Sequence, residues 1–213
     1  ENVAWAAAYD GSGSGATINE FSRTINGGET WTAGQVLGGT TYGIGNICGL
    51  DANIAYVALY NGVGTQNNTC GIYKTTNGGL TWTQLPGALQ GSASFANNVY
   101  FWNEQEGMCH GDVKDGYFEI YTTINGGATW QRVPPANITG GTPASGEGGW
   151  TSVIETAGDN TIMFGTNKGK VYISDDRGFN WRVTNANITP GSNGGINLIA
   201  FTDYNKLQID GEV

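Results

Sequence analysis

The sequence has little positive charge. Its 213 residues contain 9 Lys and Arg against 18 Asp and Glu, which gives a formal net charge of −9 and a pI near 4.4. A chain of this charge repels the phosphate backbone of nucleic acids and anionic membrane surfaces. We therefore expect no nucleic-acid partner.

Long apolar runs are also missing. No stretch approaches the roughly 18 apolar residues of a transmembrane helix, so we expect no membrane insertion. The sequence opens with ENVAWAAAYD, which has neither Met nor a charged segment followed by an apolar one. This opening predicts a processed or trimmed form.

Cysteine and histidine are scarce. The chain has 3 Cys, at Cys48, Cys70 and Cys109, and 1 His, at His110. None of them stands in a CxxC or Cys/His metal spacing, so we expect no metal and no cofactor. The cysteines allow either one disulfide with a thiol left over or three buried thiols, and buried thiols are the commoner arrangement.

Proline is rare, whereas glycine and aromatic residues are plentiful. There are 5 Pro against 36 Gly, together with 7 Trp, 10 Tyr and 7 Phe. The aromatic content is sufficient for a buried core, and the glycines indicate many turns. No stretch shows an apolar stripe of helical period with caps, so the sequence predicts an all-β fold.

One eight-residue phrase occurs four times. It reads TINGGETW at 24–31, TTNGGLTW at 75–82, TINGGATW at 123–130 and SDDRGFNW at 174–181, and the closing tryptophans lie 51, 48 and 51 residues apart. A fixed period of this length indicates a repeat architecture. The segments between the phrases read as about four short strands per period, which is typical of a β-propeller.

The repeats predict how the propeller is divided. We expect one propeller region over 1–213, with a partial blade at 1–36, blades at about 37–87, 88–136 and 137–187, and a partial blade at 188–213. The opening ENVAWAAAYDG lines up with ANIAYVALYNG at 52–62, so both ends of the sequence fall inside a repeat. The whole is expected to be an incomplete arc of a larger propeller, with further domains of a longer chain among its partners.

Each phrase has the composition of a tight hairpin. Paired glycines such as Gly27 and Gly28 permit positive φ, and Asn26 is able to cap the turn through backbone amides. The ring of Trp31 is expected to be buried under the turn, with its N–H available to a partner.

These residues resemble the Asp-box, or bacterial neuraminidase (BNR), repeat, whose pattern is Ser/Thr-x-Asp-x-Gly-x-Thr-Trp. The fourth copy has the acid, Asp176, while the first three have Asn in its place. The resemblance implies structural hairpins on the propeller rim, away from the usual ligand face, and it extends to the box-containing propellers of secreted Bacteroidetes proteins. A secreted or cell-surface location is the corresponding expectation. The matched positions are Thr24, Asn26, Gly28 and Trp31; Thr75, Asn77, Gly79 and Trp82; Thr123, Asn125, Gly127 and Trp130; and Ser174, Asp176, Gly178 and Trp181.

The resemblance also raises the question of catalysis. Sialidases hold a carboxylate with three Arg, whereas this chain has four Arg in total, all inside or next to the phrases. Other glycosidases need two carboxylates across a cleft, and no local motif identifies such a pair here. We therefore predict no catalytic residues.

The distinctive residues outside the phrases are candidates for ligand binding. His110 stands two residues before Asp112, and Trp102 and Trp150 are able to stack on sugars or contact a protein. Our first hypothesis is a non-catalytic binding or scaffold module for a glycan or protein partner. The alternative is a glycoside hydrolase, endoglucanase-like or sialidase-like, with an incomplete site in this chain. A third is an assembly factor similar to the photosystem II assembly propeller, whose basic patch is not evident in this acidic sequence.

Overall fold

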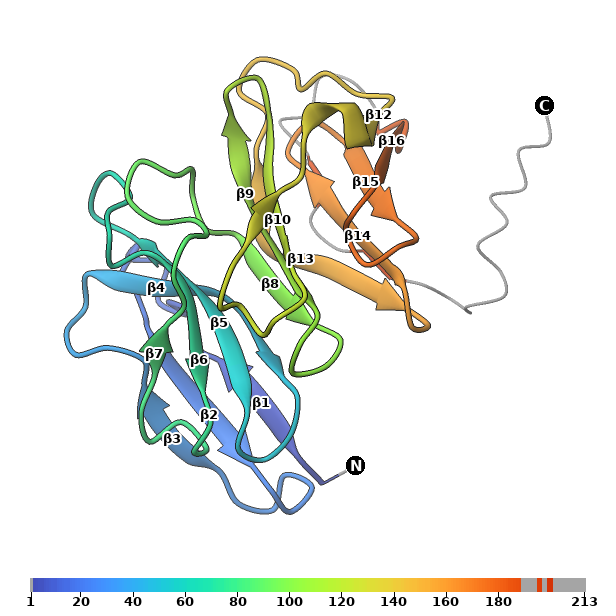
Figure 1. The fold of residues 1–213 in the computed structure, drawn as a ribbon. Coiled ribbons are helices and arrows are strands. Elements are labelled where there is room, and N and C mark those ends of the chain that lie inside the picture. The colour runs from blue at the N-terminus through green and yellow to red at the C-terminus, as the bar shows by residue number, and fades with distance from the viewer. Residues whose placement is uncertain (1, 189–194, 197–198, 201–213) are drawn as a thin grey trace.

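The structure is a computed structural model that describes residues 2–188, 195–196 and 199–200. In this part of the chain it is an all-β protein of four sheets, arranged side by side as an arc of propeller blades (Figure 1). The only helix among these residues is one 3₁₀ turn, η1 (Pro135–Asn137). The predicted all-β partial propeller is thus confirmed, while most of the predicted partial blade 188–213 lies outside the described residues.

The first two blades differ in strand number. The first blade has three strands and the second has four, each strand antiparallel to its neighbours. The strands of the first are β1 (Ala4–Ala7), β2 (Glu20–Thr24) and β3 (Thr32–Gln35); those of the second are β4 (Tyr42–Gly49), β5 (Ala55–Asn61), β6 (Gly71–Thr75) and β7 (Thr83–Gln84).

The third and fourth blades continue the arc. The third has four strands, and the fourth has four antiparallel strands extended by a short fifth, β12, which pairs with β16 in parallel. The third blade contains β8 (Asn98–Phe101), β9 (Gly107–Lys114), β10 (Tyr117–Thr123) and β11 (Gln131–Arg132); the fourth contains β13 (Gly149–Ala157), β14 (Thr161–Thr166), β15 (Lys170–Ser174), β16 (Trp181–Asn185) and β12 (Ile138–Thr139).

The core lies between neighbouring blades. Each of three buried clusters draws apolar side chains from two adjacent sheets. Tyr56 of the second blade, for example, stacks on Phe101 of the third with ring centroids 3.6 Å apart. Phe118 of the third blade meets Tyr172 of the fourth at 4.7 Å. The three cysteines are buried and free, as the second of the two sequence interpretations predicts.

The repeated phrases form hairpins held by the same internal bonds. In the first, Thr24 Oγ1 donates to Asn26 Oδ1 at 2.9 Å and accepts from Gly28 N at 2.9 Å. Asn26 Oδ1 accepts from Thr30 N at 3.0 Å, while Asn26 Nδ2 donates to Thr30 Oγ1 at 3.0 Å. The second and third phrases repeat all four bonds at Thr75, Asn77, Gly79 and Thr81 and at Thr123, Asn125, Gly127 and Thr129.

The fourth hairpin keeps this shape with the opposite hydrogen-bond polarity at one contact. Asp176 Oδ2 accepts from Asn180 Nδ2 at 2.6 Å, whereas in the other three an Asn donates to a Thr hydroxyl. Arg177 takes a φ of 60°, at the position that glycine occupies in the other hairpins. Its guanidinium bonds to Asp159 O and Asn160 Oδ1 and pairs with Glu106.

The prediction of a buried tryptophan is wrong for the first hairpin. Trp31 is 49% exposed, whereas Trp181 in the fourth is 2% exposed. Both indole N–H groups donate to the carbonyl three residues earlier, at 3.2 Å in Trp31 and 2.8 Å in Trp181. The bond orients the ring in these two hairpins, whereas the buried Nε1 atoms of Trp82 and Trp130 have no hydrogen-bond partner among the described residues. Burial of the ring depends on packing against a neighbouring blade.

Candidate functional site

The arc has two faces, one that carries the hairpins and one that does not. The hairpins follow β2, β6, β10 and β15 and therefore lie at one end of every blade. Because neighbouring strands are antiparallel, the chain leaving β1, β5, β9 and β14 emerges at the opposite end. The loops after these strands form a face separated from the hairpins.

A hollow of about 350 Å³ opens near the centre of the arc at this opposite face, and we call it the central hollow. The first blade contributes the end of β1 and the loop after it, the second contributes β4 and β5, and the fourth contributes β13. The lining residues are Ala7, Ala8, Tyr9, Asp10, Ala16, Ile18, Ile44, Gly45, Tyr60, Thr151 and Ser152.

A strained turn of β13 brings the fourth blade to this hollow. Ser152 has a φ of 61°, and the pairing of β13 with β14 shifts register between Gly149 and Ile154. Ser152 Oγ donates to the carbonyl of Gly45 in the second blade at 2.9 Å. A side chain at Gly45 would collide with the carbonyl of Asn97, so glycine permits this close approach of three blades.

The one carboxylate that lines the central hollow is occupied by its own loop. Asp10 accepts hydrogen bonds from Ser12 N and Oγ through Oδ1, and from Ser14 Oγ, Gly15 N and Ala16 N through Oδ2. The bonds from Ser12 above all hold the pKa of Asp10 well below its usual range. This carboxylate therefore anchors its loop, and its lowered pKa favours the ionised form and makes it a poor proton donor near neutral pH.

His110 is fully buried, and Asn98 connects it to Ser152 of the central hollow. Its Nε2 lies 3.0 Å from Asn98 Nδ2, and its Nδ1 lies 3.1 Å from the carbonyl of Gly111. Asn98 Oδ1 accepts from Ser152 N at 2.8 Å, so Nδ2 must point at the imidazole. Nε2 is then the acceptor, and the proton is on Nδ1. Burial lowers the pKa of His110 to about 4, which keeps the ring neutral.

Asp112 anchors the chain that leads into β13. Its Oδ1 accepts from Asn97 Nδ2 and from Gly149 N, both at 2.8 Å. Burial raises the pKa of Asp112, partly offset by these two bonds. The side chain thus positions the start of β13, next to Trp150.

Three of the four predicted ligand-binding residues are brought together and one is not. His110 and Asp112 hold the segment that contains Trp150, through Asn98 to the Trp150 carbonyl at 2.9 Å and through Gly149. Trp150 is 42% exposed. Trp102 follows β8 at the hairpin end, where its ring lies 5.9 Å from the Arg177 guanidinium. It belongs to a different surface.

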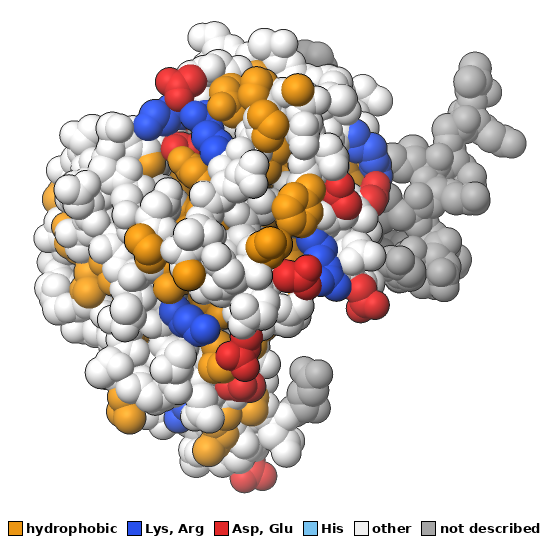
Figure 2. All heavy atoms as spheres, viewed as in Figure 1, with side chains coloured by type: hydrophobic (Ala, Val, Ile, Leu, Met, Phe, Trp, Pro, Cys, Tyr) orange, Lys and Arg blue, Asp and Glu red, His pale blue; other side chains and the backbone are white. Residues whose placement is uncertain are grey.

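Other charged groups have structural partners. Glu119 accepts from Ser94 N and Tyr121 Oη, and Glu147 pairs with Lys170 at 2.9 Å. None of the four Arg lines the central hollow. On the face in Figure 2, basic side chains lie beside acidic ones in small groups, so no extended basic surface is present there.

The described residues contain neither a cluster of metal ligands nor a membrane-spanning helix. Among the described residues, no three His, Cys, Asp or Glu side chains gather as metal ligands would. The same part of the chain contains no helix with the length and apolarity needed to cross a bilayer.

Sequence reasoning overlooked the tyrosines and the serine of the central hollow. Tyr9 and Tyr60 occupy the same repeat position in AAAYDG and VALYNG, so their shared place in the alignment was an available signal. Ser152 had no comparable signal, because its contact with Gly45 spans 107 residues and depends on a local backbone turn.

Known proteins resemble this one in structure and not in sequence. No family model and no curated protein matches the sequence. A xyloglucanase of family GH74 from Xanthomonas campestris superposes with a TM-score of 0.53 at 14% identity, over 86% of this chain and 28% of that one. A GH74 enzyme from Niastella koreensis gives 0.47 at 17% identity, over 76% and 26%. YCF48 bound to a D1 peptide gives 0.41 at 13% identity, over 79% and 76%.

These likenesses concern the fold. The chain spans about a quarter of the length of the GH74 enzymes that it matches. At such low identity the xyloglucanase supports the propeller architecture alone.

Proposed function

We propose that the chain is a non-catalytic binding module, of the Asp-box kind, from a secreted or cell-surface protein, and that it takes a glycan or protein partner at the central hollow. The observation that carries this proposal is the chemistry of that hollow. Its walls are tyrosine rings, small apolar side chains and hydroxyls, and its one carboxylate is bound by five donors of its own loop.

Binding fits this lining better than catalysis does. Glycoside hydrolysis generally needs two carboxylates, one of them able to exchange a proton. Asp10 has no second acid beside it in the lining, and its hydrogen bonds lower its pKa, whereas a general acid is favoured by a raised pKa. Tyrosine rings offer flat apolar faces together with a hydroxyl, which suits the alternating faces of a sugar or a peptide.

The alternative is a glycoside hydrolase whose remaining acids lie elsewhere in a longer protein. The likeness to GH74 domains makes xyloglucan the natural probe. Isothermal titration with xyloglucan oligosaccharides, followed by measurement of newly formed reducing ends, distinguishes capture from turnover. Capture without new reducing ends supports a glycan-binding module, whereas release of reducing ends by the purified chain contradicts the proposal.

Two tyrosine variants test whether a ligand binds at the central hollow. Tyr9 is 85% exposed, so Tyr9→Ala should leave the fold intact and weaken binding about fivefold by loss of an aromatic contact. Tyr117→Ala is the matched control, because Tyr117 packs under Arg132 on the third blade and does not line the hollow. An equal effect of both variants would place the ligand elsewhere.

A further inference from the structure

Residues 150–153, which we call the β13 bulge, reach from the fourth blade to the central hollow. β13 pairs with β14 at Gly149 and again from Ile154, so the residues of the bulge lie opposite Gly165 alone. Thr151 and Ser152 line the central hollow, and both are exposed. The bulge therefore depends for its position on contacts outside the ladder of its own sheet.

Asn98 of β8 supplies two of these contacts. Its Nδ2 donates to the Trp150 carbonyl at 2.9 Å, and its Oδ1 accepts from Ser152 N at 2.8 Å. The other hydrogen of Nδ2 points at His110 Nε2, 3.0 Å away. Because both hydrogens and the oxygen are in use, the amide has one orientation that satisfies all three partners.

This orientation requires an imidazole that is unprotonated at Nε2. With a proton there, Nε2 and Asn98 Nδ2 are two donors facing each other. Turning the amide over gives Oδ1 to the imidazolium, but it sets Nδ2 against the N–H of Ser152 and Oδ1 beside the Trp150 carbonyl. Since either orientation leaves polar groups without partners, protonated His110 is incompatible with the β13 bulge in its observed place.

The start of β13 also keeps water from the imidazole. His110 is 0% exposed, and its ring stacks on Phe164 with centroids 4.0 Å apart. A Cβ added at Gly149 would lie 3.1 Å from His110 Cε1, so the backbone at the edge of the bulge covers the ring directly. Displacement of the bulge therefore gives the ring access to water, which a charged imidazole needs.

No charged side chain is hydrogen-bonded to the imidazole, whose two nitrogens bond to Asn98 and to Gly111 O. The charged residues on the strands around it are Asp112 and Lys114 on β9, Glu119 on β10 and Glu155 on β13, while β8 and β14 have none. Asp112 binds Gly149 N, Lys114 binds Ser92 O, and Glu119 binds Ser94 N. Glu147, just before β13, pairs with Lys170. A proton on the buried ring thus has no carboxylate partner.

We infer that the β13 bulge is an acid-sensitive switch of the central hollow: protonation of His110 frees the bulge from Asn98, withdraws Thr151 and Ser152 from the lining, and weakens ligand binding there. The inference rests on the proposed function and gives the regulation of the same site. Burial lowers the pKa of His110 to about 4 in the closed form, whereas a ring open to water has the ordinary value of 6.5. The released form therefore gains population as the pH falls from 6.5 to 4.

Residue-resolved hydrogen exchange of the full chain tests the release. The protection factor of the Ser152 amide, corrected for the intrinsic rate at each pH, should fall at least tenfold between pH 6.5 and pH 4. The amide of Ala58, in the middle of β5, should change much less. An unchanged Ser152 amide would overturn the inference. Equal falls at Ser152 and Ala58 would also do so, because they indicate global unfolding.

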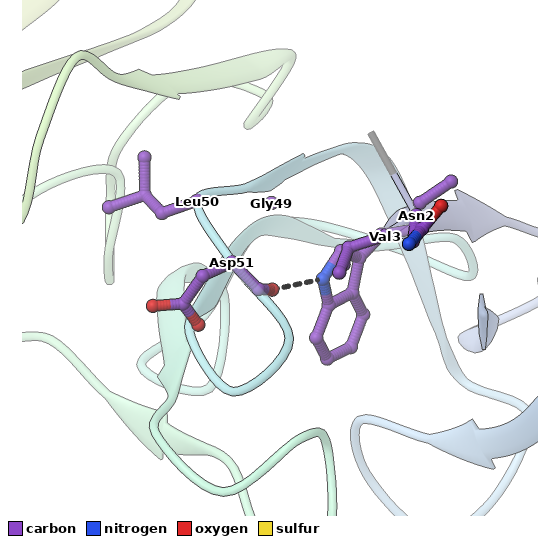
Figure 3. A pocket seen from close by; sticks show the side chains of 7 residues that line it. Asn2, Val3, Gly49, Leu50 and Asp51 are labelled. Atoms are coloured by element: carbon purple, nitrogen blue, oxygen red, sulfur yellow. Dashed lines mark hydrogen bonds between the residues drawn. The ribbon is translucent and has the colours of Figure 1, made fainter. Parts of the chain in front are cut away.

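A second reference lies in another hollow, between β1 and β4 at the hairpin end (Figure 3). Trp5 Nε1 donates to Asp51 O at 2.8 Å there, and no histidine lines this hollow. The exchange of the Trp5 indole N–H should therefore not follow that of Ser152. A parallel change at both hollows would mean a general effect of acid and would contradict a switch at His110.

Two variants identify the titrating group. His110→Gln offers Asn98 Nδ2 an amide oxygen that does not titrate, so the Ser152 protection factor should no longer depend on His110 and should stay within about twofold between pH 6.5 and pH 4. Asp112→Asn is the matched control, because it removes the other buried titrating group and keeps an oxygen for Gly149 N. The fall at Ser152 should persist in it. A fall that persists in His110→Gln, or disappears in Asp112→Asn, would overturn the inference.

The wild type decides the matter if His110→Gln does not fold. The NMR signal of the His110 Cε1 proton follows protonation of the ring directly. Its midpoint should coincide with the midpoint of the change in Ser152 protection. Midpoints that differ by more than one pH unit would show that the ring and the bulge are not coupled.

Ligand binding separates this inference from the proposed function. Xyloglucan oligosaccharides that bind at pH 6.5 should bind at least tenfold more weakly to the wild type at pH 4, and about equally at both pH values to His110→Gln. Equal affinity of the wild type at both pH values would refute the switch and retain the binding module. Absence of binding at pH 6.5 would count against a glycan-binding module, while hydrogen exchange would still show whether His110 controls the bulge.

Discussion

At the scale of single residues, the burial of the His110 imidazole makes the stability of the protein depend on pH. Its folded pKa of about 4 lies below the ordinary value of 6.5, so the unfolded chain binds the proton first as pH falls. The free energy of unfolding should therefore decrease between pH 6.5 and pH 4, by up to about 3 kcal/mol. Urea denaturation at a series of pH values measures this slope.

Variants that replace a titrating side chain by a neutral one test this assignment of the pH dependence. His110→Asn should flatten the slope whatever its effect on absolute stability. Burial raises the pKa of Asp112, so its folded form takes a proton before the unfolded form and partly offsets the loss at the acid end. Asp112→Asn removes that offset and should steepen the decline. An unchanged slope in His110→Asn would show that His110 is not buried as a neutral ring.

At the scale of the element, the four hairpins show two solutions to one hydrogen-bonding problem. Three pair an Asn donor with a Thr hydroxyl, and the fourth pairs an Asp acceptor with an Asn donor. Asp176→Asn would set two amide donors against each other at Asn180, because Oδ1 is held by Ser174 and Asn180 N. We expect a loss of about 1–2 kcal/mol, recovered largely by adding Asn180→Thr.

The third hairpin supplies the matched control. Asn125→Asp leaves Thr129 free to donate its hydroxyl to the new carboxylate, so the free energy of unfolding should change little. Urea denaturation of the single and double variants gives the coupling energy. The double variant, Asp176→Asn with Asn180→Thr, should be more stable than Asp176→Asn alone. Equal stability of the two would show that the direction of the hydrogen bond between positions 176 and 180 does not explain why the fourth hairpin differs from the other three.

The hairpins are also the part of the fold that the sequence predicts best. Their turn residues and caps are contiguous, so local chemistry determines them, and their even spacing indicates the blades. The candidate site depends on contacts that are far apart in the chain. Trp102 and Trp150 look alike in sequence, yet β8 carries Trp102 to the hairpin end while the turn at Ser152 holds Trp150 at the other. The residues around each tryptophan do not indicate whether it lies at the hairpin end of its blade or at the opposite end.

At the scale of the whole molecule, each hairpin after the first packs against the blade before it. The added Cβ positions at Gly79, Gly127 and Gly178 meet Phe21, Leu85 and Met108 of the preceding blade, whereas at Gly28 only its own Trp31 is near. The same eight-residue phrase therefore packs against a neighbouring blade in the last three hairpins, whereas in the first hairpin it has no such neighbour among the described residues. Local sequence decides the hairpin, and its neighbour decides what the hairpin contributes to stability.

Two tryptophan substitutions measure that difference. Trp181→Ala removes a ring packed against Phe164 at 5.2 Å and should cost about 3–5 kcal/mol of unfolding free energy. Trp31→Ala removes a half-exposed ring with the same intrahairpin bond and should cost less than about 1 kcal/mol. Urea denaturation of both variants gives the comparison. Equal costs would mean that a partner surface or a second copy of the chain covers the first blade in solution. Dilution of the wild type would then distinguish the two, because only self-association weakens as the chain is diluted.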